Sequence, residues 1–226
     1  MLTNRCLWYN LFRLAPRPLG VASAAPPGGC FIGEYLDAIV FIDGQNLYRS
    51  AKDAWRPQPA IGPSKYSWPS YDVETLATVL TSKTSGRTLS QIRFYTGVPR
   101  RDQNAQWHDF WKSKLGYLES QGIKVYRGKI NVHQHEKGVD VKLSVDLIRL
   151  TYEKQYEVAI IVSQDRDFEP AIQLANEIAR DQQRQLIFES HFPVGPGSHS
   201  NREIPNTRWM PIDKATYDAC LDTQDY

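Results

Sequence analysis

Cysteine is scarce in this chain of 226 residues, since only Cys6, Cys30 and Cys220 occur and they lie far apart. Three scattered cysteines exclude a disulfide framework and a cysteine-held zinc site, and they favour a reducing compartment, so we expect a cytoplasmic protein. No stretch approaches 18 uninterrupted apolar residues, which excludes a transmembrane helix, and we expect no membrane partner. The content of 41% hydrophobic and 23% charged residues excludes a disordered chain.

Charge of one sign is not in excess, because the formal net charge is only +2. The distribution along the chain is nevertheless uneven. Residues 87–154 carry thirteen basic and seven acidic side chains, whereas residues 155–226 carry six basic and twelve acidic ones. A basic segment attracts phosphate backbones and clustered carboxylates attract divalent cations. Two solvated faces of opposite sign would give the same pattern, so charge alone does not identify a partner.

The first 36 residues differ in composition from the rest. Up to Gly33 they contain three arginines and no acidic residue, with a run rich in proline, alanine and glycine at 15–29. A secretory signal fits poorly because arginine and proline interrupt any apolar segment, while a transit peptide stays possible. We interpret residues 1–36 as a flexible N-terminal tail and residues 37–226 as one globular domain.

Strand and helix patterns alternate from residue 37 onward. Short apolar runs predict buried strands and 3.6-residue periodicity predicts helices, with a proline-rich loop at 55–70 between them. The predicted strands cover 38–43, 89–96, 123–127, 157–162 and 184–188, and the predicted helices cover 45–54, 73–80, 103–121, 139–152 and 168–180. Such alternation is typical of an α/β protein, so we expect a three-layer α/β/α fold with a mainly parallel central sheet.

Two of the predicted strands end in acidic residues. Asp43 closes the first strand, and Asp165 and Asp167 follow the fourth. Ligands of open parallel sheets bind beyond the carboxyl ends of the strands, so these carboxylates converge if the two strands are neighbours. Asp140 joins them if the helix over 139–152 begins at the same edge. Taken singly, each aspartate fits equally well as a turn or helix-capping residue.

Clustered carboxylates have a definite chemical consequence. They repel one another, so at least one pKa should rise unless a cation offsets the repulsion. A ligand set made only of oxygen atoms suits Mg²⁺ or Mn²⁺ rather than zinc. A carboxylate-held Mg²⁺ activates water and stabilises charge during phosphoryl displacement. The acidic edge and the basic middle segment together point to chemistry on a phosphodiester backbone.

Three sequence motifs carry a resemblance to a known family. They are Val40-Phe-Ile-Asp-Gly-Gln-Asn-Leu47, Lys137-Gly-Val-Asp-Val-Lys-Leu-Ser-Val-Asp-Leu147 and Val162-Ser-Gln-Asp-Arg-Asp-Phe-Glu-Pro170. In order and separation they resemble the motifs of NYN-domain proteins of the LabA/DUF88 type, which belong to the PIN-like nuclease superfamily. The resemblance covers about residues 37–212. It implies a PIN-like fold and a metal-dependent ribonuclease with an acidic pocket that holds Mg²⁺ or Mn²⁺. Together with the basic middle segment, the acids at the strand ends lead us to expect an endoribonuclease that cuts single-stranded or loop RNA.

The resemblance also implies roles for individual residues. Asp43, Asp140 and Asp165 match the metal-binding catalytic acids, with Asp167 as a fourth. Two further positions match auxiliary residues of the motifs. Asn46 helps to order the pocket, and Ser163 positions a carboxylate or a water.

Asp146 matches a recurrent aspartate of the family. However, it follows Asp140 by six residues, about 240° around a helix, so both cannot face one ion unless the helix is distorted. The alternative is an ion pair of Asp146 with Lys142 on the solvent-facing side of the helix, at i,i+4 spacing.

Two residues depart from the usual family pattern, which has small residues at these positions. Gln164 removes a flexible backbone position beside the acids. Arg166 places a cation between Asp165 and Asp167, where it either competes with metal or binds substrate phosphate.

Basic and aromatic side chains near the predicted edge are candidates for RNA contact. Arg100 and Arg101 follow the second strand and Lys137 precedes the helix over 139–152, so we expect these side chains and Arg166 to bind the backbone. Each fits equally well as a solvated surface residue.

Among the aromatic residues, we assign Trp107, Phe110 and Trp111 to the core. Tyr66 and Trp68, in the proline-rich loop, are the candidates for stacking on bases of single-stranded RNA.

Two other functions stay open from the sequence. Gln164 and Arg166 are compatible with a weak or inactive NYN-fold protein that regulates or binds RNA without turnover. A structure-specific DNA nuclease is the third possibility, because related PIN-like folds cut DNA. A homodimer is a reasonable assembly in view of the many aromatic residues.

Overall fold

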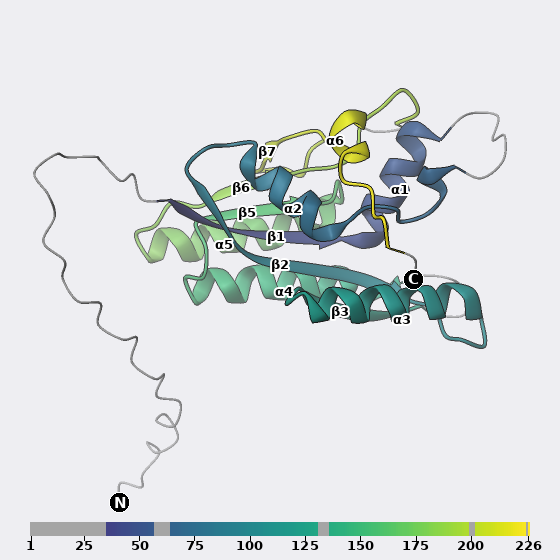
Figure 1. Cartoon of the computed structure of the whole chain (residues 1–226). Coiled ribbons are helices and arrows are strands. Elements are labelled where there is room, and N and C mark those ends of the chain that lie inside the picture. Colours follow the sequence, from purple (N-terminus) through teal and green to yellow (C-terminus); the bar gives the residue numbers. More distant parts are fainter. Residues whose placement is uncertain (1–34, 57–63, 131–135, 199–201, 225) are drawn as a thin grey trace, which may run out of the picture. The chain divides into compact units, whose positions relative to one another are not determined.

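A computed structural model describes residues 35–56, 64–130, 136–198, 202–224 and 226. The predicted tail therefore falls almost entirely outside the described residues. A single seven-stranded sheet forms the centre (Figure 1), in the order β4-β3-β2-β1-β5-β6-β7. Its strands are β1 (Leu36–Asp43), β2 (Arg87–Val98), β3 (Lys124–Ile130), β4 (Glu136–Lys137), β5 (Val158–Val162), β6 (Ile187–Ser190) and β7 (Arg208–Trp209).

Six of these strands run parallel, and only β4 pairs antiparallel to its neighbour β3. Within the described residues, the helices are α1 (Gly44–Trp55), α2 (Val73–Ser82), α3 (Ala105–Ser120), α4 (Val139–Tyr152), α5 (Glu169–Asp181) and α6 (Lys214–Asp218). Two 3₁₀ turns, η1 (Lys65–Ser67) and η2 (Arg166–Phe168), complete the elements. The α/β class and the mainly parallel sheet are as predicted from the sequence.

Two apolar layers cover the faces of the sheet. One packs α1, α2, α3 and the buried Tyr217 of α6 against the even-numbered core residues of β1, among them Val40 and Ile42. The other packs α4 and α5 against the odd-numbered ones, Ile39 and Phe41. Because β1 lies between β2 and β5 and its residues 38–42 are fully buried, alternate side chains of one strand hold the two helical layers together.

Short parts of the architecture differ from the sequence prediction. The strand predicted at 123–127 extends to Ile130 in β3, and the two-residue strand β4 was not predicted. A two-residue antiparallel strand has too little periodicity to be recognised from sequence. Within the part of the chain that the structure describes, no helix combines the length and apolar character needed to span a bilayer.

Candidate functional site

The site is built around Asp43, which ends β1 and caps α1. Its side chain is 8% exposed, and its Oδ1 accepts a hydrogen bond of 3.0 Å from the backbone N–H of Asn46. Ser163 donates from Oγ to Oδ2 at 3.5 Å. β1 and β5 pair in parallel up to Ile42 and Val162, so Asp43 and Ser163 are the first residues beyond the paired strands. The carboxylate thus lies at the carboxyl edge of the sheet, as predicted.

Gly44, the first residue of α1, packs closely against β2. A Cβ atom at this position would lie 2.5 Å from Cζ of the buried Phe94 on β2, far inside van der Waals contact. The glycine lets the first turn of α1 approach β2 closely, and this approach fixes the Asp43 carboxylate at the start of the helix. An acceptor at this position also satisfies an N–H group that the helix itself leaves unpaired.

Asn46 connects the two loops that frame the site. Its Oδ1 accepts a hydrogen bond of 3.1 Å from the backbone N–H of Gln164 and one of 3.4 Å from Ser50 Oγ. The side chain of Gln164 in turn donates to Ser50 Oγ at 3.1 Å. The start of α1 and the loop after β5 are therefore tied together by side-chain amides. Gln164 forms part of this connection, a role that its departure from the family pattern did not suggest.

The loop after β5 forms a compact turn of hydrogen bonds. The backbone N–H of Asp165 donates to Ser163 Oγ at 3.1 Å, and that of Asp167 donates to Asp165 Oδ1 at 3.0 Å. Asp165 is half-buried and caps η2, whereas Asp167 and Arg166 are exposed. Asp165 thus has the capping role that the sequence allowed as an alternative. It also lies near Asp43.

The electrostatics of Asp43 show that a second acid is near. The pKa of Asp43 is raised to about 6, mainly by burial; the Asn46 N–H lowers it and the carboxylate of Asp165 raises it. A buried acid with a like charge beside it holds its charge at a cost. A cation between the two carboxylates would remove that cost.

Asp140 lies in the first turn of α4. It is the second residue of α4, a helix that contacts η2, and its side chain is exposed. In the described part of the chain, no three or more histidine, cysteine, aspartate or glutamate side chains are grouped so as to hold a metal ion. The structure thus brings Asp43 and Asp165 together but does not join Asp140 and Asp167 to them in one cluster.

Asp146 lies in a buried ion-pair network. Its side chain is 3% exposed, and its Oδ2 accepts hydrogen bonds of 2.9 Å from both Arg93 and Tyr95 of β2. Lys142 pairs with its Oδ1, as the i,i+4 spacing predicted. However, this pair is not on a solvent-facing surface as expected, because Asp146 faces the sheet. Burial would raise the pKa of Asp146, but the hydrogen bonds from Lys142 and Tyr95 lower it. Its carboxylate therefore holds α4 against β2.

The predicted substrate-binding cations lie in different surroundings. Arg100 and Arg101 are exposed in the loop after β2, where Arg100 pairs with Asp102 and Arg101 with Asp109. Lys137 belongs to β4 and is next to Gly138, the N-cap residue of α4; its side chain falls outside the described residues. Arg166 is exposed beside Asp165.

The aromatic candidates separate into a buried and an exposed one. Tyr66 is 5% exposed and donates a hydrogen bond of 2.7 Å to Asp218, so its prediction as a base-stacking residue is wrong. The prolines of its loop predicted irregular structure, but they carry no information on which ring packs inward. Trp68 is 37% exposed. Trp111 is buried and Trp107 and Phe110 are partly buried against the core, which agrees with their predicted role.

The donors present at Asp43 fit a hard divalent cation. Mg²⁺ in proteins is usually held by one or two carboxylates, with waters and substrate phosphates as the other ligands. Asp43 and Asp165 supply two carboxylates, and the raised pKa of Asp43 is the mark of a site that a cation would stabilise. Every donor in this set is an oxygen atom, which disfavours zinc.

A family model described as "NYN domain" matches residues 37–181. A solved structure with the same fold is a protein of unknown function, VPA0982 from Vibrio parahaemolyticus RIMD 2210633, with 17% sequence identity and a TM-score of 0.50 over 80% of this chain and 95% of that one. No curated protein matches.

Proposed function

Because the chain belongs to the NYN domain family, whose members have a PIN-like fold and are generally nucleases, we propose that it is a metal-dependent endoribonuclease. Its substrate is the phosphodiester bond of single-stranded or loop RNA, and its cofactor is Mg²⁺ or Mn²⁺. The LabA/DUF88 type is the subgroup that the three motifs favour.

One observation carries the proposal: a buried carboxylate with a raised pKa lies beside a second carboxylate at the carboxyl edge of a parallel sheet. A buried carboxylate that forms no ion pair is unfavourable, and proteins retain such groups mainly where they have a function. The α/β sheet opens its ligand crevice at the same edge.

We assign each side chain of the site a role that follows from its surroundings. Asp43 and Asp165 would hold the divalent ion, which when bound supplies polarisation of the phosphoryl oxygen and favours deprotonation of an attacking water. Asn46 and Ser163 keep the two carboxylates in place through their hydrogen bonds to the framing loops. The exposed side chains of Asp140 and Asp167 are proposed to complete the acidic set when substrate is bound.

The backbone of the RNA needs cations on the same edge. Arg100 and Arg101 after β2, Lys137 before α4 and Arg166 beside Asp165 are proposed to bind phosphates. Such contacts position a nucleic acid without reading its sequence. This arrangement supports cleavage of RNA with little base specificity at the cut itself.

The test is cleavage of a labelled single-stranded RNA by the purified protein. We expect cleavage with Mg²⁺ or Mn²⁺, none with EDTA, and a loss of about a hundredfold or more in Asp43→Asn, because even residues that only support metal ligands contribute 10–100-fold. Asp181→Asn is the matched control, since Asp181 is an exposed acid at the end of α5, at the opposite edge of the sheet.

Equal rates for the parent and Asp43→Asn would contradict the metal mechanism. A parallel digest of single-stranded DNA separates the ribonuclease from a DNA nuclease.

A second candidate is an RNA-binding regulator with a weak or inactive site. It is favoured by the lack of a three-acid cluster among the described residues and by the presence of the cationic residue Arg166 between Asp165 and Asp167 in the sequence. Calorimetry with Mn²⁺ distinguishes the two functions. A nuclease binds the ion through Asp43 at physiological concentrations, whereas a regulator with a retired site shows no such binding.

A further inference from the structure

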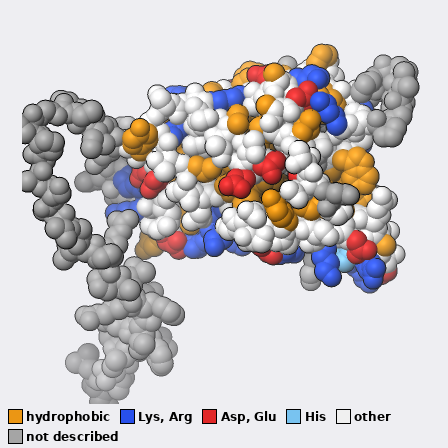
Figure 2. All heavy atoms as spheres, viewed as in Figure 1, with side chains coloured by type: hydrophobic (Ala, Val, Ile, Leu, Met, Phe, Trp, Pro, Cys, Tyr) orange, Lys and Arg blue, Asp and Glu red, His pale blue; other side chains and the backbone are white. Residues whose placement is uncertain are grey.

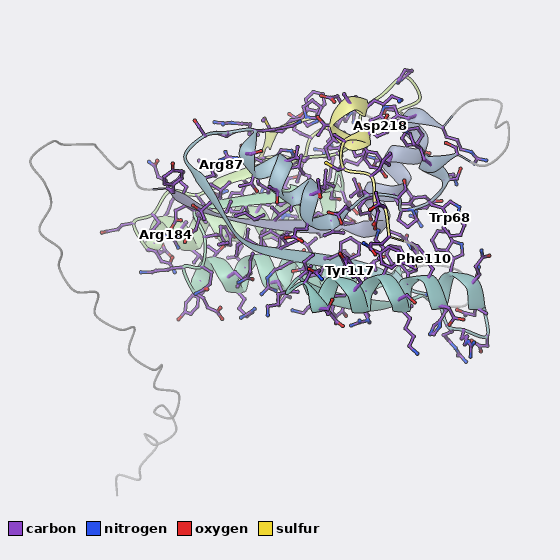
Figure 3. The ribbon with its side chains drawn as sticks, in the orientation of Figure 1. Trp68, Arg87, Phe110, Tyr117, Arg184 and Asp218 are labelled. Carbon is purple, nitrogen blue, oxygen red and sulfur yellow. The ribbon has the colours of Figure 1, made fainter. Side chains whose placement is uncertain are left out.

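An open groove of about 490 Å³ lies between the start of α3 and the C-terminal segment. Three aromatic side chains line it, Trp68, Phe110 and Tyr226. Figure 3 shows Trp68 and Phe110 together at the end of the molecule where β1 and β2 end. Figure 2 shows hydrophobic side chains exposed at this end, with Lys and Arg side chains near them. An exposed tryptophan beside a hollow suggests a binding surface.

Trp68 is held in a fixed orientation. Its ring stacks on that of Trp107, with centroids 4.6 Å apart and an angle of 29° between the planes, and it also contacts Phe110. The neighbouring Ser67 carbonyl accepts a hydrogen bond of 3.0 Å from the hydroxyl of Tyr48. The residue as a whole is 37% exposed. A rigid aromatic face of this kind stacks with a planar ligand at little entropic cost.

Lys114 fixes both walls of the groove. This side chain is 1% exposed, and its Nζ donates to the carbonyl of Pro69, which follows Trp68, and to Asp222 at 2.7 Å. The hydroxyl of Tyr226 donates to the same carboxylate at 2.9 Å, and the ammonium lies 5.0 Å from the Tyr226 ring centroid. One buried cation therefore joins the Trp68 loop to the C-terminal segment, so the groove is formed before any ligand arrives.

The rest of the groove is polar. Gln106, Asp109, Ser113 and Gln224 complete its lining. Carboxamides and a hydroxyl both donate and accept hydrogen bonds, and a carboxylate accepts them. The hydrogen bond from His108 lowers the pKa of Asp109, which stays ionised. Arg101 pairs with this carboxylate at 3.4 Å and is otherwise exposed, so a cation lies at the rim.

The groove is on the same edge of the sheet as Asp43. Its α3 residues belong to the first turns after β2 ends. Tyr48, five residues after Asp43, contacts Trp107 with ring centroids 6.2 Å apart. The first two turns of α1 therefore run from the acidic pocket to the aromatic cluster, and one strand of nucleic acid can lie along both.

We propose that this groove binds a nucleobase of single-stranded RNA, stacked on Trp68, with its polar edge toward Gln106 and Asp109 and its phosphate toward Arg101. The proposal rests on the RNA-cleaving function proposed above and adds a subsite to it. Every base has an aromatic face, whereas in a duplex that face is covered by neighbouring pairs, so the groove selects single strands.

The test is fluorescence anisotropy of a labelled single-stranded RNA of about eight nucleotides, in EDTA so that no cleavage occurs. We expect Trp68→Ala to weaken binding about tenfold, the usual effect of losing one stacked base, and Trp68→Phe to retain most of the affinity. The matched control is Tyr152→Ala on α4, a more exposed aromatic (72%) with no part in the groove. An RNA duplex of the same sequence should bind without dependence on Trp68.

Circular dichroism and thermal melting establish that each variant is folded, and Arg101→Ala, at an exposed position, adds a variant that leaves the aromatic stack intact. If folded Trp68→Ala binds RNA as tightly as the parent, and the parent cleaves RNA, the groove proposal is wrong and the nuclease proposal stands. If the parent binds RNA in a Trp68-dependent way but does not cleave it, the nuclease proposal is wrong and the groove proposal stands. A parent protein that does not bind single-stranded RNA overturns both, and a Trp68 effect on self-association alone makes the groove a contact between two copies.

Discussion

Asp43 combines two roles that make opposite demands on one carboxylate. As the cap of α1 it accepts the backbone N–H of Asn46, a role for which asparagine is equally suited. As a charged group it is buried beside Asp165, and its pKa is raised to about 6. The cap stabilises the fold and the charge does not. A substitution that removes the charge but keeps the capping hydrogen bond, such as Asp43→Asn, therefore separates the two roles.

We predict that Asp43→Asn is more stable than the parent in metal-free buffer at pH 8. A pKa that rises from 3.8 to about 6 on folding means that the fold loses stability as the pH rises from about 4 to 6, and that the full cost is present above pH 6. The cost is about 3 kcal/mol, since each tenfold change in proton affinity is about 1.4 kcal/mol. Thermal melting should show a midpoint several degrees higher for Asp43→Asn.

The stability gain of Asp43→Asn over the parent keeps the same sign at every pH, but its size depends on pH. Between pH 6 and pH 4 the folded parent keeps its proton and the cost declines, so the two melting curves should converge near pH 4. Added Mn²⁺ should stabilise the parent and not the variant. A gain that is the same at pH 4 and pH 8 would show that the charge of Asp43 is not its cause.

The sequence anticipated this residue better than its surroundings. Acids after two buried strands predicted the meeting of Asp43 and Asp165, because parallel strands bring their carboxyl ends to one edge. The paired state of Asp146 could not be derived in the same way. Its partners Arg93 and Tyr95 lie about fifty residues away on β2, and sequence spacing reports only on neighbours in the same helix.

Among the elements, β2 and β6 are joined by an ion pair across the sheet. Arg87, the first residue of β2, donates two hydrogen bonds of 2.8 and 2.7 Å to Glu189 of β6, and both side chains are at most 2% exposed. Figure 3 shows Arg87 at the end of the domain away from Trp68. Burial alone would raise the pKa of Glu189, but the hydrogen bonds from Arg87 and His191 lower it to about 2.

We predict that Glu189→Gln costs about 3–5 kcal/mol of unfolding free energy, because it leaves the guanidinium of Arg87 buried without a counter-charge. Urea denaturation measures the loss. The control is Glu153→Gln, which removes the exposed pair of Arg149 and Glu153 on α4 and should cost less than about 1 kcal/mol.

The double variant Arg87→Met with Glu189→Leu should recover much of the stability, since a buried pair is often replaceable by apolar side chains. A loss in Glu189→Gln no larger than in Glu153→Gln would show that the pair across the sheet contributes little.

Elements with strong periodicity were predictable and short ones were not. The helix expected over 139–152 is α4 with the same bounds, and the helix expected over 73–80 is α2, which begins at the same residue. In contrast, β4 and β7 have two residues each, and their pairing depends on neighbours distant in sequence. The Arg87–Glu189 pair was missed for the same reason, since no local pattern marks two charged residues as partners 102 positions apart.

At the scale of the whole domain, the fold places the two proposed sites at the ends of neighbouring strands. β1 leads directly into the acidic pocket, and β2 leads through the Arg100–Arg101 loop into α3 and the aromatic groove. The arrangement follows from the parallel sheet, whose carboxyl ends share one edge.

The central claim is that Asp43 and Asp165 together bind a divalent ion. A crystal structure of the full chain soaked in Mn²⁺, with anomalous diffraction data, tests it most directly. We predict a peak of anomalous density within coordination distance of both carboxylates, and none there in crystals of Asp43→Asn. Anomalous density elsewhere only, or a cavity filled by the guanidinium of Arg166 at saturating Mn²⁺, would contradict the account.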